Sequence, residues 1–223
     1  MTIAERLLEI RDNIETAESR SLFGQKTALL AVSKGHGADA VCEAITAGQK
    51  IFAENRVQEA AEKFPELRDA LPDLELHLIG PLQTNKVKDA VALFDVIHTV
   101  DRAALADKLA AEMQKQDRHL PCFIQVNTGE EPQKAGALPQ DLPELLAHCC
   151  ALGLNIVGLM CIPPVEHTPA IHFAFLKKLA KEHGLEQLSM GMSSDYEAAI
   201  KYGATHIRIG SAIFGDRVNS PTS

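Results

Sequence analysis

The sequence contains no tryptophan, and aromatic residues make up only 4% of its 223 residues. Proteins that bind single-stranded nucleic acid stack bases on exposed aromatic side chains, so this composition argues against such a platform. Basic residues are also outnumbered, with 22 Lys and Arg against 30 Asp and Glu and a formal charge of −8. Because a negative chain repels a polyanion, we expect no DNA-binding or membrane-surface role. A local basic pocket for one phosphate group is still compatible with this balance.

Long apolar runs are missing as well. No stretch of the sequence approaches the about 20 apolar residues that a membrane-spanning helix needs. Residues 1–6 do not form a basic region followed by an apolar stretch, which is the pattern of a secretory signal. We therefore expect a cytoplasmic protein.

The sequence also lacks the usual disulfide and metal-binding patterns. The cysteines are odd in number, form no C-x-x-C pair and mostly lie in apolar segments, so we expect reduced, buried thiols at Cys42, Cys122, Cys149, Cys150 and Cys161. The nine histidines form no H-x-x-x-H pair and no Cys/His quartet at zinc spacing. We expect no structural metal.

What the chain does contain is a regular alternation of strand-like and helix-like segments. Thr2 and Glu5 have the spacing of a capping box, and the apolar residues after them predict a leading helix over residues 2–20. Eight apolar, β-prone segments follow and are expected as strands at 27–33, 50–53, 74–79, 96–100, 122–127, 154–160, 187–190 and 206–209. Helical patterns separate them near 39–48, 56–63, 84–93, 102–116, 140–151, 168–183 and 194–202.

This alternation predicts an α/β protein in which helices cover a parallel sheet. Eight β-α repeats suit a single (β/α)8 TIM-type barrel with an extra N-terminal helix. An open doubly wound sheet is the alternative, because the second and seventh expected strands are short. Since no linker or low-complexity tract divides the chain, we expect one domain over residues 1–223.

Lys34 ends the first apolar segment, just where the chain turns. A lysine at the edge of a core is favoured in its neutral form, and a neutral amine can form a Schiff base with an aldehyde. The other interpretation is a solvated lysine at the end of a strand. The local sequence alone favours this second interpretation, because lysine is rarely fully buried.

Two later segments have the features of a phosphate site. Ser194 and Glu197 have capping-box spacing, so we expect a helix to begin there with free N–H groups beside the Ser193 hydroxyl. After the last strand, Gly210 lets the backbone approach a ligand, and Ser211 offers a hydroxyl. In a (β/α)8 barrel, a phosphate commonly binds at the loops after the seventh and eighth strands. Two ordinary turns with normal capping are the alternative.

Arg208 lies between two isoleucines in the last expected strand, so strand alternation points its side chain away from both of them. Its side chain can then reach into the ligand site. An ion pair with an acidic residue on a neighbouring loop is the other interpretation, and the sequence does not separate the two.

Six motifs occur in order along the chain. They are Ala31-Val32-Ser33-Lys34, Phe52-Ala53-Glu54-Asn55-Arg56-Val57-Gln58-Glu59, His77-Leu78-Ile79-Gly80-Pro81-Leu82-Gln83-Thr84-Asn85-Lys86, Gly158-Leu159-Met160, Leu188-Ser189-Met190-Gly191-Met192-Ser193 and Arg208-Ile209-Gly210-Ser211-Ala212-Ile213-Phe214-Gly215. Together they make the chain resemble the pyridoxal phosphate homeostasis proteins, and the resemblance covers about residues 5 to 217. These proteins are single-domain barrels similar to the N-terminal domain of alanine racemase.

The resemblance implies a protein that binds pyridoxal 5′-phosphate in an intracellular vitamin B6 homeostasis role. It assigns the Schiff base to Lys34, a place beside the cofactor to Asn55, the pyridine nitrogen to Arg208, and the phosphate group to Ser193, Ser194, Gly210 and Ser211. Lys134 matches a family lysine connected with cofactor handling. The chain departs from the family pattern at Gly37, Ala53 and Arg56, where Pro, Gly and Tyr are common, and Arg56 adds charge near the expected mouth of the site.

The sequence favours a carrier over an enzyme. Carbanion chemistry on this cofactor usually pairs the pyridine nitrogen with a carboxylate, and a permanently charged guanidinium at Arg208 disfavours the protonated ring. The similar racemases take a second acid/base from a separate domain, and the sequence offers no obvious replacement. We expect storage and delivery of pyridoxal 5′-phosphate with little or no catalysis, by a monomer whose partners are this cofactor and the apoenzymes that use it.

Two enzyme classes are the alternatives. A single-domain amino-acid racemase would use Lys34 on one face of the substrate and a second residue on the other, with candidates Tyr196, Tyr202, His77 and Cys161. A Schiff-base aldolase acting on phosphosugars in the same barrel would bind substrate at Lys34 in place of the cofactor. The joint occurrence of the six motifs makes the aldolase the weaker alternative.

Overall fold

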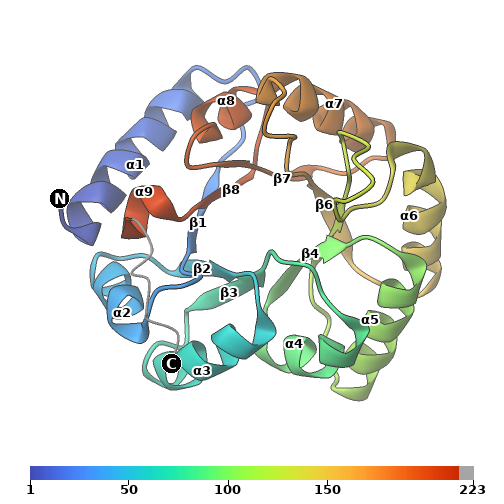
Figure 1. The fold of residues 1–223 in the computed structure, drawn as a ribbon, viewed down its shortest axis with the longest axis horizontal. Helices are drawn as coiled ribbons and strands as arrows, with labels where there is room; N and C mark the ends of the chain where they lie inside the picture. The colour runs from blue at the N-terminus through green and yellow to red at the C-terminus, as the bar shows by residue number, and fades with distance from the viewer. Residues whose placement is uncertain (216–223) are drawn as a thin grey trace.

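The computed structural model describes residues 1–215 of the chain. Eight parallel strands close into a barrel in sequence order, with β1 hydrogen-bonded to β8. Figure 1 shows the strands around the centre and the helices as an outer ring. The prediction of a (β/α)8 barrel is confirmed. The alternative of an open sheet is excluded, because an open sheet has two edge strands and here β1 pairs with β8.

The strands and helices lie close to their expected positions. The strands are β1 Ala28–Val32, β2 Ile51–Glu54, β3 Glu75–Leu78, β4 Val96–Val100, β5 Cys122–Gln125, β6 Ile156–Met160, β7 Gln187–Met192 and β8 His206–Ile209. The α-helices are α1 Ile3–Ser19, α2 Ala38–Thr46, α3 Val57–Ala70, α4 Val87–Leu93, α5 Ala103–Lys115, α6 Leu142–Ala151, α7 Pro169–Glu182, α8 Tyr196–Lys201 and α9 Ser211–Phe214, and two 3-10 turns are η1 Thr84–Lys86 and η2 Pro139–Asp141. None of these described helices is long and apolar enough to cross a membrane.

Helix α1 completes the ring of helices, as predicted for the extra N-terminal helix. Its capping box is present, since the Thr2 hydroxyl accepts from the Glu5 N–H and the Glu5 carboxylate accepts from the Thr2 N–H. Its buried face, which includes Leu7 and Ile10, packs against α8, α2 and α9. Because α9 has only four residues, α1 supplies the cover that a full helix after β8 would otherwise give.

Three local predictions are corrected by the structure. Helix α3 continues past Pro65 to Ala70, because the neighbouring Phe64 is buried and packs on Phe52, with ring centroids 5.9 Å apart. Helix α8 does not begin at Ser194: Asp195 is the N-cap, and its carboxylate accepts from the Met192 N–H at 2.6 Å. The third correction is the short helix α9, which was not expected.

The cysteines only partly follow the expectation. All five are free thiols. Cys122, Cys149 and Cys161 are buried, and burial raises the pKa of the Cys122 and Cys161 thiols to about 12. Cys42 and Cys150 are exposed, because each lies on the solvent side of an amphipathic helix.

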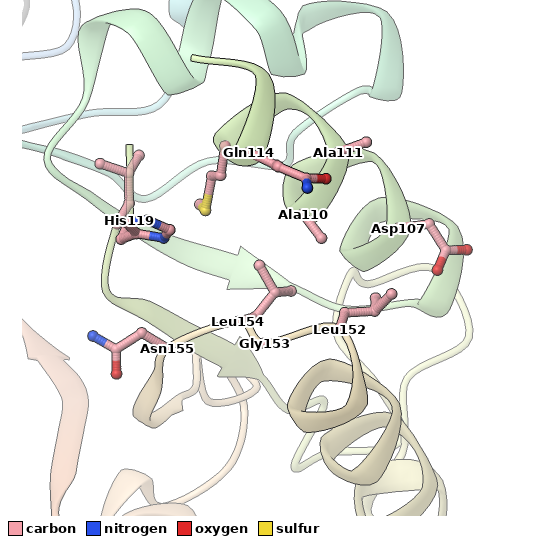
Figure 2. A pocket seen from close by; sticks show the side chains of 11 residues that line it. Asp107, Ala110, Ala111, Gln114, His119, Leu152, Gly153, Leu154 and Asn155 are labelled. Atoms are coloured by element: carbon pink, nitrogen blue, oxygen red, sulfur yellow. The ribbon is translucent and has the colours of Figure 1, made fainter. Parts of the chain in front are cut away.

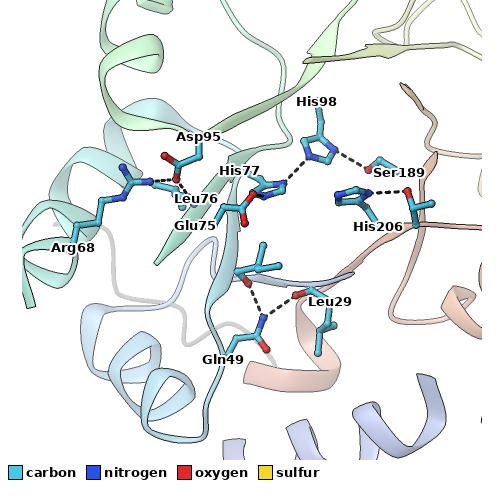
Figure 3. A network of polar contacts seen from close by, with 12 residues as sticks. Leu29, Gln49, Arg68, Glu75, Leu76, His77, Asp95, His98, Ser189 and His206 are labelled. Atoms are coloured by element: carbon cyan, nitrogen blue, oxygen red, sulfur yellow. Dashed lines mark hydrogen bonds and ion pairs between the residues drawn. The ribbon is translucent and has the colours of Figure 1, made fainter. Parts of the chain in front are cut away.

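Histidine side chains occupy part of the barrel interior. On β3, Leu76 and Leu78 pack in the outer core, so alternation directs His77 inward. His77 Nδ1 lies 2.8 Å from His98 Nε2, and the His206 ring centroid is 6.0 Å from that of His77 (Figure 3). Burial lowers the pKa of His206 to about 4 and holds the pKa of His98 well below its usual value.

A buried ion pair lies on the other face of the sheet, between β2 and α3. The Lys63 Nζ is 2.5 Å from Glu54 Oε1, and the two side chains are 9% and 0% exposed. Burial raises the pKa of Glu54, and hydrogen bonds from Lys63 and Ser33 oppose this rise. The pair ties a helix to a strand, and its removal on one side leaves an uncompensated charge in the core.

Replacing Lys63 by methionine is expected to lower the free energy of unfolding by about 3–5 kcal/mol, since Glu54 loses its cation in a buried position. Lys50→Met is the matched control, because Lys50 pairs with Asp73 on the exposed surface, and it should change stability by less than about 1 kcal/mol. Urea denaturation of both variants makes the comparison. Adding Glu54→Gln to Lys63→Met should restore part of the lost free energy of unfolding. Equal stabilities of Lys63→Met and Lys50→Met would contradict this account.

Acid should destabilise the protein through its interior histidines. The folded-state pKa of His206 is about 4, below the about 6.5 of an unfolded histidine, so its contribution is fully present above pH 6.5 and is lost as the pH falls through 4. Between pH 7 and pH 5 this group alone should remove up to about 2 kcal/mol of unfolding free energy. Denaturation measured between pH 7 and pH 5 should show a smaller loss of unfolding free energy in His206→Gln than in the unaltered protein. If the unfolding free energy falls equally with pH in the two proteins, His206 is not a source of the acid sensitivity.

Candidate functional site

A cavity of about 580 Å³ opens at the carboxyl ends of the strands, where a barrel of this class places its ligand site. Its walls come from the ends of β1, β2, β3, β6, β7 and β8 and from the loops after them. The described lining residues are Val32, Lys34, His36, Asn55, Ile79, Gly80, Pro81, Ile162, Met192, Ser193, Ser194, Arg208, Gly210, Ser211 and Gly215.

All seven residues that the sequence analysis selected for the cofactor lie around this one cavity. They are Lys34, Asn55, Ser193, Ser194, Arg208, Gly210 and Ser211. These residues come from four strand ends that are separated by up to 177 positions in the chain, so only closure of the barrel brings them together. Their individual contacts with a ligand remain predictions.

The backbone of the loop that carries Lys34 is hydrogen-bonded to the Glu54–Lys63 pair on the outer face of the sheet. The Lys63 Nζ donates to the carbonyl oxygens of Ser33 and His36, at 2.9 and 3.1 Å. The Glu59 carboxylate accepts from the Gly35 N–H on the same loop and from Lys63 Nζ at 3.0 Å. The backbone on both sides of Lys34 is therefore held in place by hydrogen bonds from Lys63 and to Glu59.

The two expected phosphate-binding loops lie side by side. The Gly210 N–H points to Ser193 Oγ at 3.4 Å, which joins the loop after β7 to the loop after β8. A Cβ atom at Gly210 would lie 3.2 Å from the Val32 carbonyl oxygen, so a side chain here would crowd the wall of the cavity. Although Ser194 is not a helix cap, it lines the cavity, as Ser211 does.

Arg208 faces the cavity from the barrel interior, as strand alternation predicted. Its side chain is nearly buried, with 4% of the residue exposed. Nη1 donates to Ser189 Oγ at 2.8 Å and Nη2 donates to the Cys161 carbonyl at 2.9 Å. Its hydrogen-bond partners are thus a hydroxyl and a carbonyl, and the interpretation of an ion pair with a loop carboxylate is not supported by this geometry.

Asn55 contributes an acceptor whose bonding is incomplete. Its side-chain Oδ1 is buried and has no hydrogen-bond partner among residues 1–215. Such an oxygen is costly to leave unpaired, so a ligand donor beside it would be stabilised. Gly80 allows this arrangement, since a Cβ there would lie only 2.1 Å from the Asn55 carbonyl oxygen.

Several lining residues were not selected from the sequence. Val32 is the last residue of β1 and Ile79 directly follows the last residue of β3, and both pack in the cluster that contains Leu30 and Ala53. The two-residue period of β1 and β3 was the signal that could have found them. His36 stacks on Phe214 with ring centroids 5.2 Å apart, and a contact so distant in sequence gave no local signal. These residues form the apolar and aromatic part of the wall.

The other residues named in the sequence analysis lie elsewhere. Lys134 is paired with Glu131 at 2.6 Å and is not among the described lining residues. The same holds for the four candidates for a second catalytic face. Tyr196 shares a hydrogen bond with Asn13, Tyr202 ends α8 near the surface, His77 lies deeper in the barrel, and Cys161 is buried.

A second cavity, of about 520 Å³, lies at the opposite end of the barrel (Figure 2). Its walls include Leu120 and Leu154, which precede β5 and β6, and it opens beside α5. Asp107 at its edge is hydrogen-bonded to His148 at 2.7 Å. Its described lining residues include no amine, guanidinium or adjacent hydroxyl groups like those that converge in the first cavity, so the first cavity is the candidate functional site.

Comparison with known proteins assigns the chain to a family. The model of the alanine racemase N-terminal domain matches residues 6–218. The pyridoxal phosphate homeostasis protein of Pseudomonas aeruginosa is 43% identical over 97% of this chain and 96% of its own length, and that of Escherichia coli K12 is 39% identical over 96% and 97%.

The solved structures give the same answer. PipY of Synechococcus elongatus, in its form with pyridoxal phosphate bound, is 42% identical and superimposes with a TM-score of 0.84 over 96% of this chain and 100% of that one. Sequence identity of this size over nearly the full length of both chains, together with the shared barrel, settles the assignment. This protein therefore belongs to the pyridoxal phosphate homeostasis protein family.

Proposed function

We propose that this protein binds pyridoxal 5′-phosphate in the cavity at the carboxyl ends of its strands and stores or delivers it, with little or no turnover of its own. The observation that carries the proposal is the convergence of seven separately predicted residues on one cavity. The family relationship supports the choice of cofactor, because the related PipY structure holds it. Delivery to apoenzymes by a cytoplasmic monomer is part of the proposal.

The residues around the cavity fit the chemical groups of this cofactor. A volume of about 580 Å³ lies within the about 300–1,000 Å³ usual for small-molecule sites. Ser193, Ser194, Ser211 and the backbone at Gly210 provide hydroxyl and N–H donors for a phosphate. Lys34 supplies an amine for the aldehyde, and the unpaired Asn55 Oδ1 supplies an acceptor for a donor on the ligand.

Arg208 determines which chemistry the site supports. When bound, this cofactor can supply an electron sink, which is strongest with a protonated ring nitrogen. The Arg208 guanidinium is permanently charged and donates only, so beside that nitrogen it favours the unprotonated ring. With Arg208 beside the ring nitrogen, the site can still bind the cofactor, but the cofactor stabilises a carbanion less well.

The second face of the cavity also argues against a racemase. Two-base racemisation needs a proton donor opposite Lys34, within hydrogen-bond reach of the substrate. Tyr196, Tyr202, His77 and Cys161 are not among the described residues that line the cavity. Cys161 is a poor acid/base in addition, because burial raises the pKa of its thiol to about 12.

Covalent binding at Lys34 can be tested by reduction. The purified protein, incubated with pyridoxal 5′-phosphate and then treated with borohydride, should gain the mass of one reduced cofactor on the peptide that contains Lys34, since reduction makes the linkage to Nζ a stable amine. Lys34→Ala should gain none. Lys134→Ala is the matched control and should label fully, because Lys134 is paired with Glu131 away from the cavity lining. Labelling that persists in Lys34→Ala would contradict the proposal.

Turnover can be tested by proton exchange in deuterated water. The loaded protein should cause no Lys34-dependent exchange at Cα of alanine or serine, because Arg208 beside the ring nitrogen would weaken carbanion stabilisation and none of the four candidate second bases is among the described lining residues. Mass spectrometry of the amino acids after long incubation, with Lys34→Ala as the background, gives the measurement. Exchange that disappears in Lys34→Ala would favour the racemase instead.

A further inference from the structure

A continuous chain of hydrogen bonds crosses the barrel interior. Figure 3 shows the part that runs from His77 through His98 to Ser189, and Ser189 is hydrogen-bonded in turn to Arg208. Glu75 Oε1 is 2.9 Å from His77 Nε2, and His77 Nδ1 is 2.8 Å from His98 Nε2. His98 Nδ1 is 2.9 Å from Ser189 Oγ, which is 2.8 Å from Arg208 Nη1. The chain starts at the amino-terminal end of β3, where the Glu75 side chain is 45% exposed, and ends at the cavity.

The two ends of this chain fix its direction. A guanidinium has donors and no acceptor, so the Ser189 oxygen must accept from Arg208. The Glu75 carboxylate has acceptors only, so His77 must carry a proton on Nε2. The hydrogen bond from His77 lowers the pKa of Glu75, in agreement with an ionised carboxylate at this end.

The middle of the chain then has one arrangement that satisfies every group with neutral rings. With its proton on Nε2, His77 accepts at Nδ1 from the His98 Nε2–H. His98 in turn accepts at Nδ1 from the Ser189 hydroxyl proton, which leaves the Ser189 lone pairs for Arg208. The burial that lowers the pKa of His98 keeps its ring neutral.

The opposite direction is unfavourable. It would require His77 to donate from both nitrogens and so to carry a positive charge beside His98 and His206. The Ser189 oxygen would then accept from two donors, and its own buried proton would lose its acceptor at His98. Neutral histidines with Nε2 protons avoid both costs.

We propose that His77, His98 and Ser189 are positioning residues that hold the Arg208 guanidinium against the cavity, through a chain in which every proton points from Ser189 toward Glu75. Aligned bonds polarise one another, so Ser189 becomes a better acceptor for Arg208 than an isolated hydroxyl. With the bond from Nη2 to the Cys161 carbonyl, both terminal nitrogens of Arg208 are anchored. The effect of this arrangement on cofactor binding rests on the proposed function, whereas the hydrogen-bond chain itself does not.

The proton positions can be measured without the cofactor. In protein labelled with 15N histidine at pH 8, the spectra of His77 and His98 should show Nε2 protonated and Nδ1 unprotonated, with assignments from the His77→Gln and His98→Gln variants. A proton on His98 Nδ1 would reverse the chain and overturn the inference. This measurement is independent of whether the protein binds any ligand.

The effect on Arg208 can be measured with paired variants. His98→Phe removes both ring nitrogens, and loss of a hydrogen bond to a charged group should weaken binding of pyridoxal 5′-phosphate about tenfold. Its affinity for inorganic phosphate should stay unchanged, because the Ser193 and Gly210 loops are not part of the chain. His98→Gln offers an amide oxygen and an N–H₂ in place of the two nitrogens and should recover most of the loss.

His172→Phe is the matched control, because His172 is also buried but bonds to Thr128 and His167 outside the chain. It should bind the cofactor as the unaltered protein does. If the unaltered protein binds the cofactor and folded His98→Phe binds equally well, the positioning role is wrong. If the unaltered protein does not bind the cofactor, the proposed function fails, and the histidine spectra still decide the direction of the chain.

Discussion

Parallel closure of the barrel is the constraint on which the site depends. Because every strand runs in the same direction, all eight carboxyl ends meet at one rim, and polar residues that follow different strands are brought together there. Lys34 after β1 and Ser193 after β7 line the same cavity because both follow strands that end at this rim. The pairing of β1 with β8 is the step that completes the site, since it places Leu30 in register with Arg208.

A second constraint follows from burying polar groups inside this barrel. An arginine, a serine and three histidines inside the barrel are tolerated only where their hydrogen bonds are satisfied. The chain from Glu75 to Arg208 meets this condition by letting its charged ends carry opposite signs, with neutral groups between them. The Glu54–Lys63 pair meets it on the outer face of the sheet and also holds the backbone beside Lys34. In both cases, buried polar groups that satisfy one another also bond to a residue of the cavity or to the backbone beside one.

The sequence was sufficient for the fold and for much of the site, because both depend on short-range patterns. Strand periodicity and turn residues located every strand to within a few positions. Alternation pointed the Arg208 side chain away from its isoleucine neighbours, but it did not separate a place in the ligand site from an ion pair with a loop carboxylate. The capping box at Ser194 failed, because the Asp195 carboxylate turns back to the Met192 N–H and competes for the start of the helix.

Long-range contacts could not be predicted in the same way. The bonds of Lys63 to the carbonyls of Ser33 and His36 join residues about 30 positions apart, and no local pattern indicates them. The contact between His98 and Ser189 spans 91 positions. Each side chain alone looks like an ordinary polar residue in a strand, and its role appears only when the register of the closed barrel is known.

Under the proposed function, the composition of the cavity would let one site both hold and release a phosphorylated cofactor. At the proposed phosphate end, the described donors are hydroxyl and N–H groups, which bind an anion less strongly than paired cations do. The basic groups Lys34 and Arg208 are instead directed to the aldehyde and the ring in the proposed arrangement. Retention would then depend on the reversible bond at Lys34 and on the orientation of Arg208, so that loss of either contact would weaken binding. A carrier requires this property, whereas an enzyme that keeps its cofactor through many turnovers gains from a tighter phosphate site.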